Sequence, residues 1–216
     1  MKNIKVVLGC LTMLATISAG CTVTTSGSLS AGSPTPAAKA STAATPAAAA
    51  KTVPAAKIVP VPENWITMED GQKGYSFEVP EGTEHHNEKS GGVDVFIAGT
   101  PKPSEVGVMV MAFKDPNLTK DDLVKVASGA LEGLGAKNVK IGSLTELSPD
   151  YSLASYTALN EDGKPVKGKV LVATDVTDNY VMLVGAEEPQ YQSNEKIIDQ
   201  IWGSFSMHSG GASGKS

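Results

Sequence analysis

The side chains best suited to chemistry lie at His85-His86, where two imidazoles stand next to each other. Three glutamates are close by in the sequence: Glu81, Glu84 and Glu88. Imidazole and carboxylate ligands suit zinc and related metals, so His85 and His86 are weak candidates for metal binding. Adjacent side chains on a strand point to opposite faces, however, and do not easily share one ion. The remaining histidine, His208, lies near the C-terminus. We therefore favour a solvated loop over a metal site.

Other constellations that carry chemistry are missing from the sequence. There is no GxSxG nucleophile elbow, no phosphate-binding P-loop and no dinucleotide-binding glycine pattern. The acidic pairs Asp175/Asp178 and Glu161/Asp162 lack the spacing of an EF-hand, and solvated turns are expected there. We therefore predict no catalytic residue and no cofactor, that is, a protein that is not an enzyme.

The N-terminus carries a secretory signal that ends at a cysteine. Lys2 and Lys5 precede a mostly apolar run, which is shorter than the ~20 residues that a membrane-spanning helix needs. The run is followed by Ser18-Ala19-Gly20 and then by Cys21. This pattern is typical of a signal peptide, here residues 1–20. Because Cys10 falls within it, the mature chain keeps Cys21 alone and forms no internal disulfide.

The stretch Ile17-Ser18-Ala19-Gly20-Cys21 resembles the lipobox of bacterial lipoproteins. In that family a diacylglycerol is attached to the cysteine thiol, the signal is removed and the new N-terminus is acylated (palmitate). The resemblance implies that Cys21 is the lipid attachment site and that the protein is anchored in a membrane of the bacterial cell envelope. The residue directly after the cysteine is Thr22 rather than Asp, which resembles lipoproteins that are sorted by default to an outer membrane. If the source has two membranes, the resemblance implies an outer-membrane protein that faces the periplasm. The alternative is an ordinary secreted protein.

Composition narrows the classes of partner. All 18 basic residues are lysines, against 23 acidic residues and a net charge of −5. Nucleic acids require basic patches, so an acidic chain without arginine predicts no nucleic-acid partner. The expected contacts are with the membrane, through the lipid anchor, and with a protein partner that the sequence does not identify.

The chain divides into segments of different composition. Residues 21–62 are predicted to be a disordered linker that begins at the lipidated Cys21, since a segment rich in Ala, Thr, Pro and Ser buries too little apolar surface to fold. Residues 63–208 are predicted to form one globular domain. Residues 209–216 are predicted to be a disordered tail.

Hydrophobic periodicity predicts the element order β-β-β-α-β-β-β-β-α for the domain. Strands are expected at 74–80, 93–98, 106–113, 139–147, 151–160, 166–176 and 180–187. A helix is expected from the N-cap Thr119, with Asp122 completing a capping box, to Gly135. A second helix is expected from about Ser193, with Trp202 and Phe205 in the core, as are Met109 and Met111. Short connections favour hairpins. The expected fold class is α+β, an antiparallel sheet of six to seven strands flanked by helices on both faces (an α/β/α sandwich).

The beginning and end of this domain resemble PsbP-like domains. The resemblance lies in Trp65, in the segment Gly74-Tyr75-Ser76-Phe77-Glu78-Val79-Pro80-Glu81-Gly82, and in a final helix that contains Ile197-Ile198-Asp199-Gln200-Ile201-Trp202. Members include the oxygen-evolving extrinsic protein of photosystem II, a Ran-binding import factor and bacterial lipoproteins without assigned function. The resemblance implies a non-enzymatic binding or assembly scaffold.

The leading interpretation is a lipid-anchored accessory protein that binds another protein. The alternative is a lipoprotein that binds a small molecule in a pocket between sheet and helix, and an envelope enzyme is a remote third possibility.

The anchor can be tested with Cys21→Ser. Because two or more acyl chains hold a protein stably in a bilayer, at ~0.8 kcal/mol per buried CH₂, we expect the variant to leave the membrane fraction while its domain stays folded. Fractionation of cells followed by circular dichroism of the released chain checks this. Retention of the variant in the membrane would contradict the anchor at Cys21.

Overall fold

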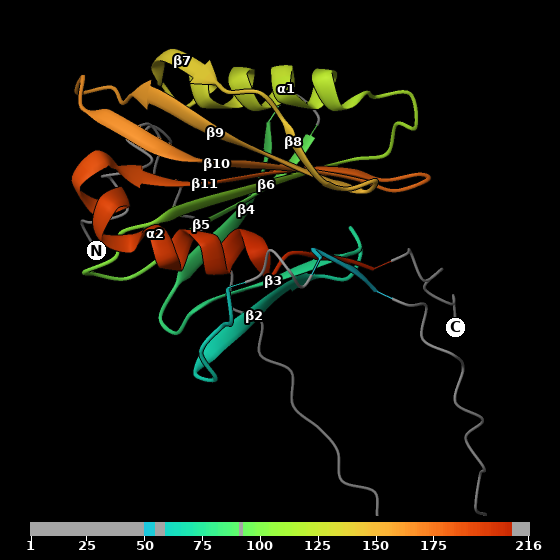
Figure 1. Ribbon diagram of the computed structural model, residues 1–216, viewed down its shortest axis with the longest axis horizontal. Helices are drawn as coiled ribbons and strands as arrows, with labels where there is room; N and C mark the ends of the chain where they lie inside the picture. Colours follow the sequence, from blue (N-terminus) through green and yellow to red (C-terminus); the bar gives the residue numbers. More distant parts are fainter. Residues whose placement is uncertain (1–49, 55–58, 91–92, 209–216) are drawn as a thin grey trace, which may run out of the picture. The chain divides into compact units, whose positions relative to one another are not determined.

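The computed structural model describes residues 50–54, 59–90 and 93–208 (Figure 1). The predicted signal peptide (1–20), Cys21, most of the predicted linker and the predicted tail (209–216) lie outside these residues. No helix in the described part of the chain is long and apolar enough to cross a membrane.

Antiparallel strands dominate the described domain. The strands before the first helix are β1 (Lys51–Thr52), β2 (Trp65–Asp70), β3 (Tyr75–Pro80), β4 (Glu84–Ser90), β5 (Val93–Gly99) and β6 (Gly107–Phe113). Next come α1 (Lys120–Gly133), β7 (Lys137–Ile141), β8 (Thr145–Ser148), β9 (Tyr151–Leu159), β10 (Pro165–Thr174), β11 (Asn179–Glu187), α2 (Glu188–Gly203) and β12 (Ser206–Met207).

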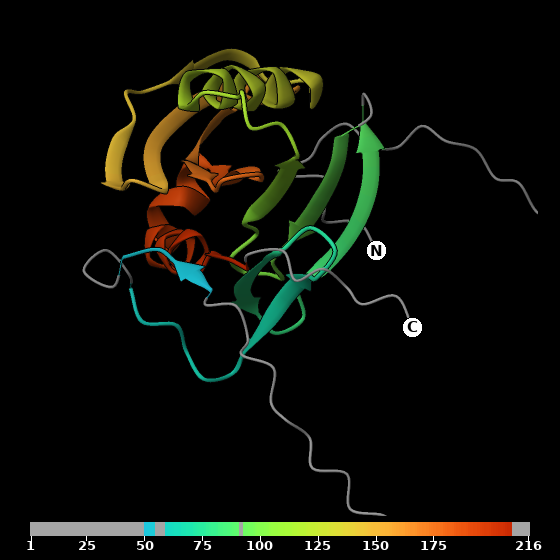
Figure 2. The ribbon, with the colours of Figure 1, turned by 90° about the vertical axis from the view of Figure 1, so that its right-hand side faces the viewer.

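The strands form two sheets. The larger has eight strands in the order β4-β5-β6-β11-β10-β9-β7, with β8 also paired to β9, and the smaller has the order β1-β12-β3-β2. Figure 2 shows β2 and β3 set apart from the strands of the larger sheet. The predicted α+β class, with antiparallel strands and two helices, is confirmed. The expectation of one sheet with six to seven strands is wrong, because β1, β2, β4 and β12 are too short or too polar to show an apolar pattern.

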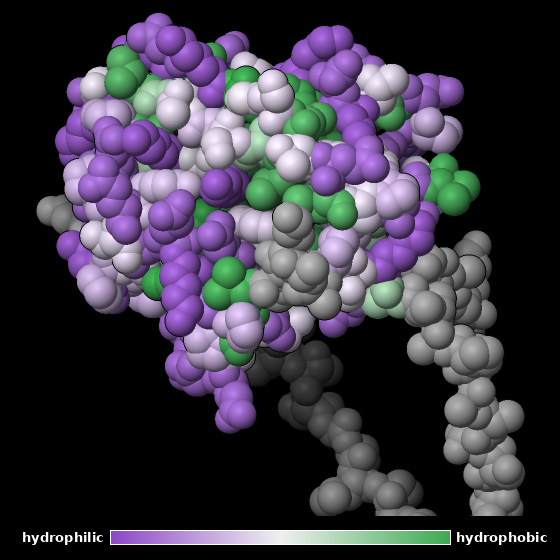
Figure 3. Space-filling model, viewed as in Figure 1, coloured by the Kyte–Doolittle hydropathy of each residue, from purple (hydrophilic) through white to green (hydrophobic). Residues whose placement is uncertain are grey.

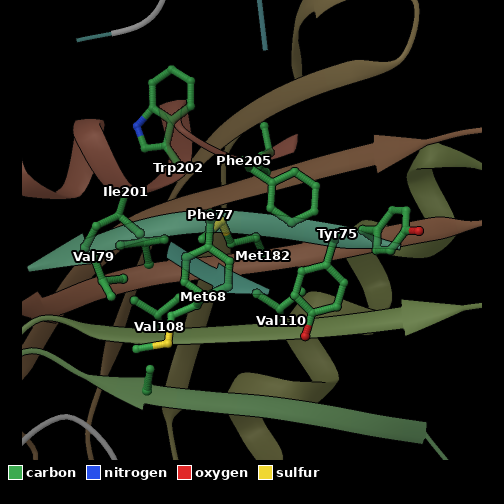
Figure 4. Close-up of a cluster of buried hydrophobic side chains, with 14 of the residues drawn as sticks. Met68, Tyr75, Phe77, Val79, Val108, Val110, Met182, Ile201, Trp202 and Phe205 are labelled. Carbon is green, nitrogen blue, oxygen red and sulfur yellow. The ribbon is translucent and has the colours of Figure 1, made fainter. Parts of the chain in front are cut away.

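Alternate residues of the central strands belong to two separate hydrophobic clusters. The first cluster joins Val108, Val110, Met182 and Val184 of the larger sheet to Tyr75, Phe77 and Val79 of β3 and to Ile198, Ile201 and Trp202 of α2. Figure 4 shows Phe77, Val108, Met182 and Ile201 gathered in it. The second cluster joins Met109, Met111, Val170, Val172, Val181 and Leu183 to Leu123, Ala127 and Leu131 of α1. The predicted core positions Trp202, Phe205, Met109 and Met111 are all buried.

Helix α1 begins and ends as its sequence predicts. The Thr119 hydroxyl accepts a hydrogen bond from the Asp122 backbone N–H at 3.2 Å, and the Asp122 carboxylate accepts one from the Thr119 N–H at 3.3 Å. At the other end Gly135 has φ +83°, a conformation that favours glycine. The Ala136 N–H then reaches the Leu131 carbonyl at 3.0 Å, which closes a Schellman motif.

Residues 51–53 were predicted to be linker but belong to the fold. Lys51 and Thr52 pair with β12, and Val53 is fully buried. The Tyr151 hydroxyl donates to the Lys51 carbonyl at 2.6 Å, and the Lys51 ammonium contacts Asp175 at 2.7 Å. The residues that hold β1 in place are far away in the sequence. A strand of two residues is also too short to show an apolar pattern, so the sequence did not predict it.

Two further element boundaries differ from the prediction. The strand expected at 139–147 is two strands, β7 and β8, because the chain leaves the ladder between them. Helix α2 begins at Glu188 rather than near Ser193, and Asn194, with φ −122°, interrupts its helical backbone close to the predicted start.

The capping box of α1 gives a prediction with a characteristic pH dependence. Thr119→Ala should lower the free energy of unfolding by about 1 kcal/mol at neutral pH. The hydrogen bond from the Thr119 hydroxyl, followed by Lys125, lowers the pKa of Asp122 to about 2 from its ordinary 3.8. The contribution of the box should therefore be complete above about pH 4 and decline as the pH falls toward 2. Urea denaturation of both chains across this range is the measurement, and a difference that does not change with pH would contradict the prediction.

Candidate functional site: a pocket beside Tyr156

One register row across the larger sheet carries a tyrosine and four glycines. Tyr156 of β9 lies opposite Gly168 of β10, which lies opposite Gly185 of β11. The row continues through Gly107 of β6 to Gly99 of β5. Four neighbouring strands thus present no side chain at this level of the sheet.

The ring of Tyr156 occupies the space that two of these glycines leave. A Cβ atom at Gly168 would lie 2.3 Å from a carbon of the Tyr156 ring, and one at Gly185 would lie 2.2 Å from its hydroxyl oxygen. Any larger residue at either position would collide with the tyrosine. The ring therefore crosses β10, and its hydroxyl reaches β11.

A cavity of about 50 Å³ lies beside Tyr156. Its walls come from β6, from β9 to β11 and from the end of α1, with side chains such as Met109, Leu131, Leu134 and Leu183. The polar residues among its lining are Tyr156, Asn160 and Glu161. A space of this size holds a few water molecules or a small apolar group.

The Tyr156 hydroxyl has no hydrogen-bond partner among the described residues, although the residue is only 4% exposed. The hydroxyls of Tyr151 and Tyr180, in contrast, donate to the carbonyls of Lys51 and Lys73, each at 2.6 Å. Burial, and to a lesser extent Tyr191, raises the pKa of Tyr156, so at neutral pH the hydroxyl is a hydrogen-bond donor. The hydroxyl oxygen is not among the fully buried polar atoms without a partner in the described residues, so the atom keeps some access and can donate to an acceptor atom of a ligand.

The turn between β9 and β10 forms the rim of the pocket and is tied to a buried carboxylate. The Glu187 side chain accepts a hydrogen bond from the Asn160 amide at 3.1 Å and pairs with the Lys164 ammonium at 3.3 Å. On the other side, the Glu161 side chain lies so close to Gly135 that a Cβ there would come within 2.6 Å of it. The turn therefore packs against the end of α1.

The structure places His85 and His86 on the edge strand β4 rather than in the predicted loop. The His85 ring stacks on Phe96, with ring centroids 5.4 Å apart, and the two histidines face opposite sides of the sheet. No group of three or more His, Cys, Asp or Glu side chains in residues 50–54, 59–90 and 93–208 is placed to hold a metal ion. The predicted lipid attachment site, Cys21, lies outside these residues.

Sequence reasoning missed a serine–histidine pair. His208 Nε2 lies 2.8 Å from the Ser76 hydroxyl, and the His208 backbone N–H donates to the Gly74 carbonyl at 2.7 Å. Within the described residues no carboxylate contacts the imidazole, so the pair lacks the third member of a catalytic triad. The pair instead fixes the segment after β12 to β3.

Comparison with known proteins gives a fold but no close relative. No family model matches the sequence, and no curated protein matches it. The solution structure of the cyanobacterial PsbP (CyanoP) from Synechocystis matches 67% of this chain and 92% of its own, with a TM-score of 0.53 and 18% identity. A crystal structure from Bacteroides thetaiotaomicron matches 67% of this chain and 48% of its own, with a TM-score of 0.45 and 12% identity. The first likeness defines the domain as PsbP-like in fold.

The close approach of Tyr156 to Gly185 can be tested by a double-mutant cycle. Gly185→Ala should lower the free energy of unfolding by about 1–3 kcal/mol, since its methyl group would meet the Tyr156 hydroxyl oxygen and the Lys167 carbonyl oxygen. In the Tyr156→Phe background the same change should cost less, because that oxygen is gone. Urea denaturation measures both.

Gly129→Ala is the matched control for this cycle. Gly129 lies within α1, and a Cβ there meets nothing within 4 Å, so alanine should stabilise the helix by about 1 kcal/mol. If the changes in the free energy of unfolding caused by Gly185→Ala and Tyr156→Phe were strictly additive, the Tyr156 ring would not lie against Gly185.

Proposed function

We propose that this chain is a lipid-anchored, non-enzymatic protein of the bacterial cell envelope whose PsbP-like domain binds a small, neutral, largely apolar molecule. In this proposal Cys21 holds the protein on the membrane, and α1 and α2 flank the larger sheet on opposite faces. The observation that carries the binding function is that Tyr156 lines an apolar pocket and that its hydroxyl donates to no acceptor among the described residues.

The lining of the pocket selects the chemistry of the ligand. Aliphatic walls favour an alkyl or other apolar body. The Tyr156 hydroxyl donates to one acceptor oxygen, such as that of a ketone, ester, amide or alcohol. Glu161 lies at the rim, and the charge of Lys164 is already paired with Glu187. Among the described residues that line the pocket there is no cationic side chain, so a carboxylate ligand would gain no ion pair there, and a neutral head group is preferred.

The same lining supports binding rather than catalysis. Covalent catalysis requires a nucleophile that is activated by a neighbouring base. The polar groups around the pocket are a phenol, an amide and a carboxylate, and no Ser, Cys, His or Lys side chain accompanies them. A binding protein needs only an apolar cavity and one or a few well-placed hydrogen-bonding groups.

Tyr156→Phe tests this function directly. With 2-butanone as the probe and the Cys21→Ser chain in solution, we expect the amide signals of Gly107 and Gly185 to shift on titration in NMR spectra. Loss of one hydrogen bond should weaken binding about threefold to tenfold in Tyr156→Phe.

Tyr151→Phe is the control, since its hydroxyl is bonded to the Lys51 carbonyl and does not line the pocket. This variant should bind 2-butanone like the parent chain, and butyrate should bind the parent more weakly than 2-butanone does. Equal affinity of the Tyr156→Phe and parent chains would rule out the hydroxyl as the ligand's partner.

A further inference from the structure

Strand β9 exposes the side that faces away from Tyr156. Its even-numbered residues from 154 to 158 are at most 6% exposed. Of its odd-numbered residues, Ser155 and Thr157 are exposed and Leu153 and Leu159 are half-buried. These four side chains form the open face of β9. The face is distinct from the pocket, so the inference drawn from it goes beyond the proposed ligand binding.

Helix α2 covers the neighbouring strands but leaves this face uncovered. Ile198 and Ile201 of α2 belong to the same cluster as Leu171 of β10 and Met182 of β11. On β9 the cover ends at Leu153, which packs against that cluster while staying partly exposed. Figure 3 shows the surface of the domain in the orientation of Figure 1. This surface is largely hydrophilic, with small groups of apolar residues.

Lysines border the open face of β9 on both of its long sides. On β10, Lys167 lies opposite Thr157 and Lys169 lies opposite Ser155. On β7, Lys140 also lies opposite Thr157, and Lys137 lies opposite Leu159. Neighbouring strands are ~4.8 Å apart, so the two rows of lysines lie roughly 10 Å from each other.

Three of these four lysines have no acidic partner among the described residues. Thirteen lysines are described, and eight of them form ion pairs. Lys167 is among the eight, through Glu188. Lys137, Lys140 and Lys169 are not, and Lys169 contacts only the Ser155 hydroxyl, at 3.3 Å. A chain with a net charge of −5 thus gathers uncompensated positive charge on one face.

We propose that the open face of β9 docks an extended, acidic segment of a partner protein. Residues two apart on a strand are ~6.6–6.8 Å apart, so Lys140 and Lys137, which are unpaired among the described residues and lie opposite Thr157 and Leu159, match alternate carboxylates of an extended chain. The half-buried Leu153 and Leu159 supply apolar contact at the two ends. Charge complementarity of this kind sets the orientation of the partner and the rate of encounter.

The test uses the Cys21→Ser chain and a synthetic peptide with alternating glutamate and threonine. We expect the peptide to bind and its glutamine counterpart not to bind, and binding should weaken steeply between 0.05 and about 0.5 M salt because the pairs are exposed. Lys140→Gln/Lys169→Gln should lower the affinity about threefold to tenfold, since each exposed ion pair contributes modestly. Isothermal calorimetry measures the affinities, and NMR shifts locate the peptide.

Lys89→Gln/Lys114→Gln is the matched control, with the same change in charge at exposed positions on other elements. It should bind the peptide like the parent chain. An equal loss of affinity in both double variants, or no binding of the peptide, would overturn the proposal.

A second experiment measures binding to vesicles of phosphatidylglycerol, with vesicles of phosphatidylcholine as the reference. Binding of the anionic vesicles but not of the peptide, with loss in Lys140→Gln/Lys169→Gln, would assign the face to a lipid surface and overturn the protein partner.

Discussion

The central strand β11 is buried along its whole length, and the rest of the domain depends on this constraint. Its neighbouring residues belong to different cores, since Met182 and Val184 are in the cluster that includes residues of α2 and β3, while Val181 and Leu183 are in the cluster that includes residues of α1. A slip of one residue would exchange the two sets. Burial of one such side chain contributes ~1.5–3 kcal/mol, so the register of β6, β10 and β11 is strongly determined. Both helices and the smaller sheet then attach to surfaces whose side chains are already placed.

The pocket lies where the sheet has glycines, so that no side chains are available there to pack against the end of α1. The core beneath α1 is continuous from Leu123 to Leu131. Beyond it the helix ends and the sheet presents glycines instead of aliphatic residues. Tyr156 fills part of the gap by lying over Gly168 and Gly185, and the space over Gly107 stays open. Protein interiors are otherwise packed nearly as densely as organic crystals, so a gap beside Tyr156 is a local property of this row.

Local sequence was sufficient for some elements and insufficient for others. Helix α1 follows from its apolar spacing, from Thr119 and from Gly135, all of which act within a few residues. The long hairpin β10–β11 follows from its apolar runs and its short turn. Strands β1 and β12, in contrast, are two residues each and are held by partners more than a hundred residues away. The pocket was unpredictable for the same reason, because the row from Tyr156 to Gly99 exists only once five strands are in register.

The proposed binding functions rest on groups that the fold leaves without a partner among the described residues. For stability alone, phenylalanine would serve at position 156 as well as tyrosine, because the hydroxyl gains no hydrogen bond from the described residues. Alternating charges beside β9 would likewise be less repulsive than lysines at 137, 140 and 169. A binding protein has no reactive group to reveal its role, so its function must be read from polar atoms and charges that only a second molecule would satisfy. The Tyr156 hydroxyl and the lysines at 137, 140 and 169 lie on the two sides of one strand, β9, so the proposed ligand pocket and the proposed docking face are back to back.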